Sequence, residues 1–311
     1  MSTAFFTHLD CRGHDMGRGH PESAQRLAAI EDHLLAVGLE ATLLRREAPM
    51  VELKHVEFAH NAGYVNELRE LLEQVAGSGT PRALDPDTSA SAGTWNAVRR
   101  GAGAAVAATQ GVLAGEFDNA FCSVRPPGHH ATRGQAMGFC FFNNVAIAAR
   151  YALDVGGLER VAIVDFDVHH GNGTEDIIAN DERILMVSYF QHPLYPGSGV
   201  PPLGNNMVNL PVPPYTKGPA IRALIEQHWL PRLDTFRPQM MFISAGFDAH
   251  REDGLGQLGL VEADYEWMTK RLKDVADKHG KGRIVSCLEG GYNLSALARS
   301  VAAHLRVLSG G

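Results

Sequence analysis

The sequence predicts a single-domain, three-layer α/β fold in which a mostly parallel, doubly wound sheet lies between two layers of helices. Short apolar runs rich in β-branched residues alternate with longer segments of helical spacing along the 311 residues, as in parallel strands joined by crossover helices. No linker, repeat or low-complexity segment interrupts this alternation. Because α/β folds reach this length without splitting, we interpret residues 1–311 as one domain.

Composition argues against several classes of protein. With 35 acidic and 28 basic residues the formal charge is −7, which argues against nucleic acid as the main partner because phosphate binding needs a basic face. The N-terminus has no signal-peptide pattern and no apolar run approaches the ~18 residues of a membrane helix, so no membrane association is expected. The four cysteines form no CxxC pair and are expected to be reduced thiols of a cytoplasmic protein. The oligomeric state is left open.

The first half of the chain contains three predicted strands and three predicted helices. The strands are short apolar runs at 3–8, 41–46 and 119–124. The helices have helical spacing of apolar residues and lie at 21–38, 62–76 and 94–115. The last helix is rich in glycine and alanine, which favours close packing against the sheet.

The second half continues the alternation with five predicted strands. They are the apolar runs at 161–164, 184–189, 207–212, 239–246 and 283–288. The predicted helices are at 143–153, 217–230, 262–279 and 293–308. The long loops follow strands, where parallel α/β sheets keep their ligand crevice.

The stretch VAIVDFDVHHGNG, at 161–173, carries the first chemical signal. A buried strand runs directly into Asp165, Asp167 and His169. Residues two apart on an extended segment point to the same side, so Asp167 and His169 face one point at the strand's carboxyl end. A carboxylate and an imidazole sharing that point suggest a divalent-metal site. The alternative is that the two aspartates cap the next helix and His169 is an ordinary loop histidine.

A third ligand follows another apolar strand, in QMMFISAGFDAHREDG, where Asp248 stands just beyond the strand end. Asp167, His169 and Asp248 would form a site with one nitrogen and two carboxylate ligands. Such a site leaves a position open for water or substrate, which is typical of a catalytic metal. We expect one Zn²⁺ per chain, although Fe²⁺, Mn²⁺ or Co²⁺ accept the same ligands.

Two further strand ends carry candidate catalytic residues. In RPPGHH, a stiff turn presents His129 and His130 side by side, which suits proton transfer to and from water at a metal. In CLEGGYN, two glycines precede Tyr292, whose hydroxyl can donate a hydrogen bond to a developing oxyanion. Taken singly, the histidines could be a surface pair and the tyrosine structural.

With these motifs together, the chain resembles the histone deacetylase family of the arginase–deacetylase fold. The matching motifs are RPPGHH, GFCFFNN, DFDVHHGNG, SAGFDAH and EGGYN. HPE at 20–22 and DPDT at 85–88 resemble the class II branch and its bacterial relatives. The resemblance extends from His20 to Tyr292.

The resemblance implies that Asp167, His169 and Asp248 hold Zn²⁺. It makes His129 and His130 the tandem acid–base pair, and Tyr292 the oxyanion donor. Further residues receive roles in binding the substrate or a monovalent cation. Gly138 and Phe139 would line the substrate tunnel, with Tyr195 or Phe190 opposite them, and Asp85 or Asp87 would hold the substrate backbone. Leu255, rather than Glu252 or Asp253, would be the gate-like residue at the pocket mouth. Asp165 and Ser188 would belong to a site for K⁺.

One position departs from much of the wider family. Asn172 stands where many members have a second aspartate beside the second histidine, although the class II branch shares the asparagine. If Asn172 partners His130, the pKa of that histidine should be lower than with a carboxylate partner, because an amide can orient an imidazole but cannot neutralise an imidazolium. Asp165 is expected to keep His129 an electrostatic partner.

The implied function is zinc-dependent removal of acetyl or other acyl groups from acetyl-lysine-type amides. The main alternative is an acetylpolyamine amidohydrolase, whose substrate is a small acetylated amine. An arginase-like hydrolase would need a second metal and a denser carboxylate cluster than FDAHREDG offers. A non-catalytic acyl-lysine binding protein is the remaining alternative, and the presence of Tyr292 argues against it. The sequence does not fix the physiological substrate, the acyl-chain length or the native metal.

Overall fold

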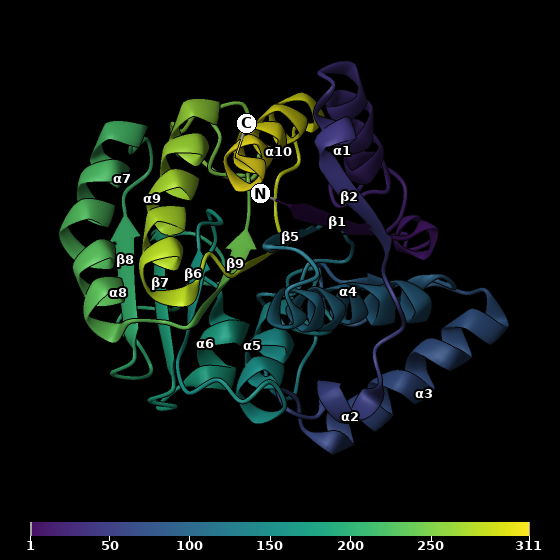
Figure 1. The fold of residues 1–311 in the computed structure, drawn as a ribbon. Helices are drawn as coiled ribbons and strands as arrows, with labels where there is room; N and C mark the ends of the chain where they lie inside the picture. Colours follow the sequence, from purple (N-terminus) through teal and green to yellow (C-terminus); the bar gives the residue numbers. More distant parts are fainter. Residues whose placement is uncertain (1, 311) are drawn as a thin grey trace.

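The computed structural model describes residues 2–310 and has one large parallel sheet with helices on both faces (Figure 1). The sheet order is β2-β1-β5-β10-β9-β6-β7-β8, and all of its strand pairs are parallel. The strands are β1 Thr3–Thr7, β2 Leu43–Glu47, β5 Asn119–Cys122, β6 Val161–Asp165, β7 Ile184–Gln191, β8 Met207–Val212, β9 Met240–Ala245 and β10 Ile284–Leu288. The predicted three-layer α/β fold is confirmed.

The helices form one layer on each face of the sheet, as Figure 1 shows. One layer contains α1 Gln25–Ala36, α7 Gly218–Leu224, α8 Leu230–Phe236, α9 Glu262–Gly280 and α10 Leu294–Ser309. The other contains α2 Leu53–Val56, α3 Ala62–Ser78, α4 Thr94–Ala114, α5 Asn144–Asp154 and α6 Asn172–Ile178. The glycines of α4 allow close contact, since a Cβ on Gly103 would lie 1.9 Å from the carbonyl oxygen of Pro49.

Three details differ from the sequence-based expectation. Helix α1 begins at Gln25 rather than at Pro21. The helix expected to end at residue 230 continues to Phe236 through a π-helical turn at Ile225–Trp229. Pro231 follows that turn, and a proline has no N–H to donate and crowds the preceding turn, which accounts for the local widening. Within the loop at 77–91, β3 (Arg82–Ala83) and β4 (Ser89–Ala90) form a short antiparallel pair that the sequence did not reveal.

The strands that carry the candidate site residues are consecutive in the middle of the sheet, in the order β5, β10, β9, β6. Each is buried along its whole length. In a parallel sheet the carboxyl ends of neighbouring strands lie at one edge. The four motifs that follow these strands are therefore brought to one place.

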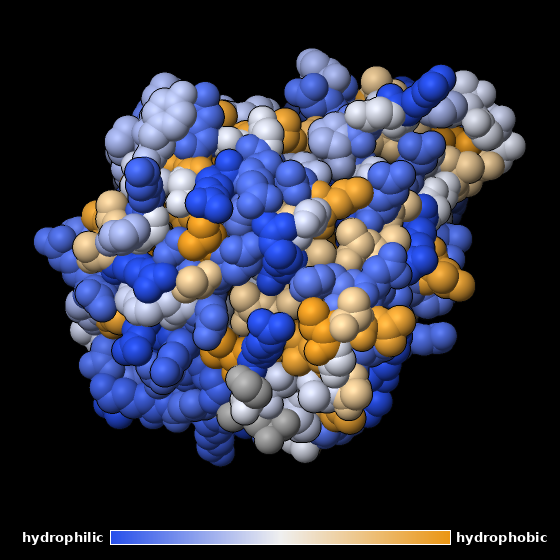
Figure 2. Space-filling view, turned by 90° about the horizontal axis from the view of Figure 1, so that it is seen from above, coloured by the Kyte–Doolittle hydropathy of each residue, from blue (hydrophilic) through white to orange (hydrophobic). Residues whose placement is uncertain are grey.

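The surface seen from above is mainly hydrophilic, with apolar residues in separate groups (Figure 2). Among residues 2–310, no helix is both long and apolar enough to cross a membrane. The four cysteines are all buried and unpaired, as expected for reduced core thiols.

Candidate active site

Two carboxylates and one imidazole meet at the carboxyl ends of β6 and β9. Asp167 and Asp248 are fully buried, and the His169 side chain is 12% exposed. Nδ1 of His169 lies 2.9 Å from Oδ1 of Asp167 and 3.2 Å from Oδ2 of Asp248. Each residue offers one ligand atom within 4.8 Å of the other two. The structure thus brings together the three residues expected to hold a metal.

This donor set fits a divalent cation better than it fits hydrogen bonding alone. Nδ1 of His169 carries at most one proton, so it cannot donate to both carboxylates at once. Oδ2 of Asp248 is buried and has no hydrogen-bond partner among residues 2–310. Burial and the nearby Asp167 raise the pKa of Asp248 to about 7. A cation would compensate both carboxylates, and imidazole and carboxylate are ligands that Zn²⁺ accepts.

Glycines and backbone amides hold the two carboxylates in place. A Cβ on Gly290 would lie 2.0 Å from Oδ2 of Asp248, and one on Gly246 would lie 2.0 Å from Oδ2 of Asp167. The Gly290 N–H donates to Oδ2 of Asp167 at 2.8 Å, and the Val168 N–H donates to Oδ1 of Asp248 at 3.0 Å. Glycine at both positions therefore lets the backbone approach the site closely.

The two adjacent histidines lie beside these carboxylates with different partners. Nδ1 of His129 is 2.9 Å from Oδ2 of Asp165, and Nδ1 of His130 is 2.8 Å from Oδ1 of Asn172. The ring centroids of the two histidines are 4.1 Å apart. The pairing expected from the sequence, a carboxylate behind one imidazole and an amide behind the other, is present.

The pKa values of the two imidazoles are shifted in opposite directions. Burial by itself disfavours the charged ring, but Asp165 and Asp167 outweigh it and raise the pKa of His129 to about 10. Burial lowers the pKa of His130, and the neighbouring rings of His129 and His169 lower it further. His129 is thus suited to carry a positive charge, while His130 is suited to remain neutral.

Above the triad lies a pocket of about 380 Å³. It is lined by His20, Pro21, Asp87, His130, Gly138, Phe139, His169, Leu194, Tyr195, Leu255 and Tyr292. Burial raises the pKa of the Tyr292 phenol, so its hydroxyl stays protonated and can donate a hydrogen bond. The pocket therefore presents an imidazole, a phenol and the candidate metal ligand His169 to anything that enters it.

Two pairs of aromatic rings line this pocket. The Phe139 ring meets that of Tyr292 edge to face, with centroids 6.0 Å apart, and the Tyr195 ring meets that of His130 with centroids 5.1 Å apart. Phe190, the other candidate for the second side, is buried against His170 and does not line the pocket. Gly138 is required here, because a Cβ would lie 2.5 Å from the His130 ring.

The structure also distinguishes among the acidic residues near the pocket mouth. Oδ1 of Asp85 accepts hydrogen bonds from the N–H groups of Asp87 and Thr88, so Asp85 holds its own loop together. Asp87 lines the pocket. Glu252 is paired with Arg299 at 3.0 Å rather than directed at the mouth.

Ser188, expected beside Asp165 in a cation site, is on β7 directly opposite Asp165 on β6. Both residues are almost completely buried. Oδ1 of Asp165 accepts the Asp167 N–H at 3.1 Å, and the Ser188 hydroxyl donates to Oδ1 of Asn209 at 3.4 Å.

The contacts of two buried glutamate side chains, Glu22 and Glu289, were not expected from the sequence. Glu22 forms a bidentate ion pair with Arg125 and also contacts Arg26. Oε2 of Glu289 accepts the N–H groups of Gly128 and His129 at 2.6 and 3.1 Å, and so fixes the turn before the histidine pair. Glu22, Arg125 and Glu289 belong to the quoted motifs HPE, RPPGHH and EGGYN, but spacing alone does not show that such residues meet.

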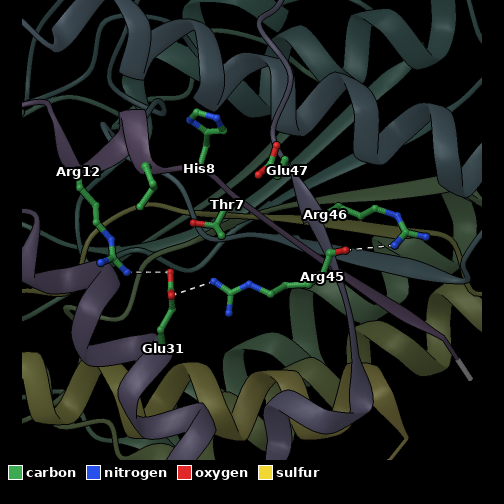
Figure 3. A pocket seen from close by; sticks show the side chains of 8 residues that line it. Thr7, His8, Arg12, Glu31, Arg45, Arg46 and Glu47 are labelled. Carbon is green, nitrogen blue, oxygen red and sulfur yellow. Dashed lines mark hydrogen bonds and ion pairs between the residues drawn. The ribbon is translucent and has the colours of Figure 1, made fainter.

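A second hollow, of about 310 Å³, lies at the carboxyl ends of β1 and β2 (Figure 3). Glu31 lies between Arg12 and Arg45 there, at 3.1 and 2.9 Å. These charges compensate one another, and β5 and β10 separate β1 and β2 from β9 and β6, the strands that carry the metal triad. We assign it no role in the chemistry.

Comparison with known proteins agrees with this geometry. A family model described as "Histone deacetylase domain" matches residues 20–308. A protein of Archaeoglobus fulgidus named "Probable deacetylase" is 37% identical over 302 residues, covering 94% of this chain and 82% of its own. The "Histone deacetylase-like amidohydrolase" of Pseudomonas aeruginosa is 37% identical, covering 88% of this chain and 73% of its own.

A solved structure is similar over almost the whole molecule. The crystal structure titled "HDA15 HD domain" superimposes with a TM-score of 0.92 at 32% sequence identity. The match covers 99% of this chain and 90% of the other.

Proposed function

Because this chain belongs to the histone deacetylase family, we propose that it is a zinc-dependent hydrolase that removes acetyl groups from acetyl-lysine-type amides. The observation that supports this most is the convergence of Asp167, His169 and Asp248 at the base of a pocket that also contains His130 and Tyr292. Three ligands facing an open pocket leave a coordination position for water or substrate, as catalytic zinc sites do.

In this proposal the metal site activates both reactants. Asp167, His169 and Asp248 would hold a divalent ion, which would supply a Lewis acid for the amide carbonyl and would lower the pKa of water toward ~7. Tyr292 donates its hydroxyl hydrogen to the oxygen of the substrate carbonyl as negative charge develops there. Removing one such donor typically lowers kcat by ~10² to 10³.

The two histidines divide the proton transfers. His130, neutral beside Asn172, accepts the proton of the attacking water and later delivers a proton to the departing amine. His129 remains cationic against Asp165 and stabilises negative charge nearby without leaving its partner. The opposite pKa directions and the distances of 2.8 and 2.9 Å to the two partners support this division.

The walls of the pocket suit a linear acylated side chain. Phe139 and Tyr195 offer apolar faces to methylene groups, and Asp87 at the mouth offers a carboxylate to the backbone N–H groups of a peptide. Asp165 and Ser188 are proposed to bind K⁺ beneath the histidine pair, where a cation would help to fix the strand ends.

An acetylpolyamine is the second candidate substrate. A cationic amine would gain from a carboxylate at the pocket mouth, but the loop after Asp248 presents Leu255 there. Glu252 is occupied by Arg299, and Asp253 is buried. We expect kcat/KM for an acetyl-lysine peptide to exceed that for acetylputrescine, and the Leu255→Glu change to shift the ratio toward the polyamine.

The test is a substrate panel on the purified, metal-loaded protein together with its Tyr292→Phe variant. The panel contains an acetyl-lysine peptide, a neutral aryl acetamide, acetylputrescine and acetylspermidine. Tyr292→Phe should keep hydroxamate binding and lose ~10²-fold or more in kcat. Absence of turnover on every substrate would favour an acyl-lysine binding protein, and a tenfold preference for acetylpolyamines would reverse the ranking.

A further inference from the structure

One carboxylate joins the catalytic tyrosine to the mouth of the pocket. Asp253, in the loop after Asp248, is 8% exposed. Its Oδ2 accepts the N–H groups of Tyr292 at 2.6 Å and Asn293 at 3.0 Å. Its Oδ1 accepts the N–H of Leu255 at 3.0 Å. A single side chain thus fixes the backbone of two pocket residues that are distant in sequence.

Two further contacts link the loop that contains Asp253 to helix α10. The Asn293 side chain accepts the N–H of Ala296 as the N-cap of α10 and donates to the carbonyl of Glu252 at 3.1 Å. Arg299, one turn further along α10, pairs with the Glu252 carboxylate. These outer contacts dock α10 against the loop, whereas the Asp253 contacts reach the tyrosine itself.

The backbone of Tyr292 needs such an external support. Gly290 and Gly291 precede it, and Gly291 has φ +121°, a conformation open mainly to glycine. Two glycines place little intrinsic restriction on the direction of the next residue. The Tyr292 N–H precedes the first turn of α10 and would otherwise have no acceptor within the helix. Asp253 satisfies it with a charged acceptor, which makes a stronger hydrogen bond than a neutral one.

From these contacts the structure assigns Asp253 as a positioning residue of Tyr292, a carboxylate that sets the tyrosine hydroxyl against the substrate carbonyl and aligns it with Leu255 at the pocket mouth. Arg26 supports the same segment, because it donates to the Gly291 carbonyl at 2.7 Å and lies 5.0 Å from the centroid of the Tyr292 ring. This assignment deepens the proposed function and rests on it. Asp253 does not touch the reacting atoms; it acts through the tyrosine backbone. A displacement of about 1 Å in such a group can cost ~10²-fold in rate.

The alternative is that Asp253 only stabilises the start of α10, where a negative charge is favourable. The two roles differ in a double-mutant cycle. If Asp253 acts through the Tyr292 hydroxyl, Asp253→Asn matters only while that hydroxyl is present. If it is merely structural, its effect on kcat is the same with or without the hydroxyl.

The experiment measures kcat, KM, zinc content and the thermal midpoint for wild type, Asp253→Asn, Tyr292→Phe and the double variant, with an acetyl-lysine peptide. Asp253→Asn is expected to lower kcat about tenfold or more, with KM changed less than about threefold and zinc content unchanged. In the Tyr292→Phe background the same change is expected to lower kcat less than about twofold.

Two control variants test whether loss of a negative charge in this loop, or loss of α10 stability, is enough to lower kcat without any displacement of Tyr292. Glu252→Gln removes a neighbouring carboxylate of the same loop, and Asn293→Ala removes the N-cap of α10 while sparing the Tyr292 N–H. Both are expected to keep kcat within about twofold of wild type, although Asn293→Ala lowers the thermal midpoint. If Asp253→Asn is unfolded at the assay temperature, Asp253→Glu takes its place in the cycle, since it keeps the charge and displaces the oxygens.

Equal losses of kcat in the two backgrounds, or loss of zinc from the single variant, would overturn the assignment while leaving the proposed function intact. A wild-type protein that hydrolyses no amide would instead overturn the proposed function, and this inference with it.

Discussion

At the residue scale, two chemically identical side chains acquire different properties from what lies behind them. His129 and His130 are neighbours in sequence and their rings are in contact. Asp165 provides a full negative charge to one ring, and Asn172 provides a neutral oxygen to the other. The pKa of His129 is raised because Asp165 and Asp167 outweigh the effect of burial, whereas burial and the rings of His129 and His169 lower the pKa of His130, which Asn172 cannot offset.

This difference predicts unequal effects of mutation. His130→Ala should lower kcat by ~10³ or more, because the group that moves the proton is lost, whereas His129→Ala should be strongly impaired but measurably more active. Steady-state kinetics with equal zinc loading in both variants measures the difference. Equal residual activities would mean that the two histidines do not divide the work as proposed.

A second residue-scale prediction concerns acid stability. Burial by itself raises the pKa of Glu22, but Arg125, His14 and Arg26 outweigh it and lower the pKa to about 2 from a usual value near 4.5. A carboxyl whose folded pKa is depressed stabilises the fold above its unfolded pKa, and this contribution disappears as the pH falls from about 4.5 toward 2. Glu22→Gln should therefore lower the free energy of unfolding by ~3 kcal/mol or more at pH 7, since it leaves buried guanidinium groups less compensated.

Urea unfolding of wild type and Glu22→Gln at a series of pH values checks this prediction. The difference in unfolding free energy should be constant above pH 5 and should narrow as the pH falls below 4.5. A difference that stays constant down to pH 3 would contradict the assigned pKa.

At the scale of secondary structure, the site depends on how closely the turn after β10 approaches the turns after β6 and β9. Gly290 has no room for a side chain, since its Cβ would lie 2.0 Å from Asp248 and 2.6 Å from Asp167. Gly290→Ala should displace both carboxylates and weaken zinc binding by ~10- to 100-fold, as does disturbance of groups around metal ligands elsewhere.

Competition with a chromogenic chelator measures that affinity. Gly63→Ala is the matched control, because nothing lies within 4 Å of the added methyl group and alanine is favoured over glycine within a helix. It should bind zinc as wild type does. Unchanged zinc affinity in Gly290→Ala would show that the turn can move away without disturbing the site.

The sequence predicts correctly those elements whose pattern lies within one short segment of the chain. Each predicted apolar run forms a strand, and the central strands β5, β6, β9 and β10 are buried throughout. The residues directly after β6 and β9 meet because parallel strands end at a common edge. The sequence does not predict contacts between side chains and backbone groups that are distant along the chain. The roles of Asp253 and Glu289 depend on backbone N–H groups brought from other segments, and no spacing in the sequence records such contacts.

At the scale of the whole molecule, the strand order explains why one site receives its residues from the whole chain. The motif residues span from His20 to Tyr292, yet β5, β10, β9 and β6 are neighbours at the centre of the sheet. The carboxyl ends of these four strands supply the histidine pair, the tyrosine and the metal triad. Two buried carboxylates at this point repel each other, so a cation at the triad should be integral to the active state.

The most direct test of this account is a zinc titration of chelator-treated protein, with turnover of an acetyl-lysine peptide as the readout. Activity should be absent without metal, rise linearly with added Zn²⁺ and reach its plateau at one equivalent per chain, and Asp248→Ala should show neither tight binding nor turnover, because two ligands hold zinc poorly. Full activity in the metal-free protein, or a plateau only at two equivalents, would contradict the single-metal mechanism.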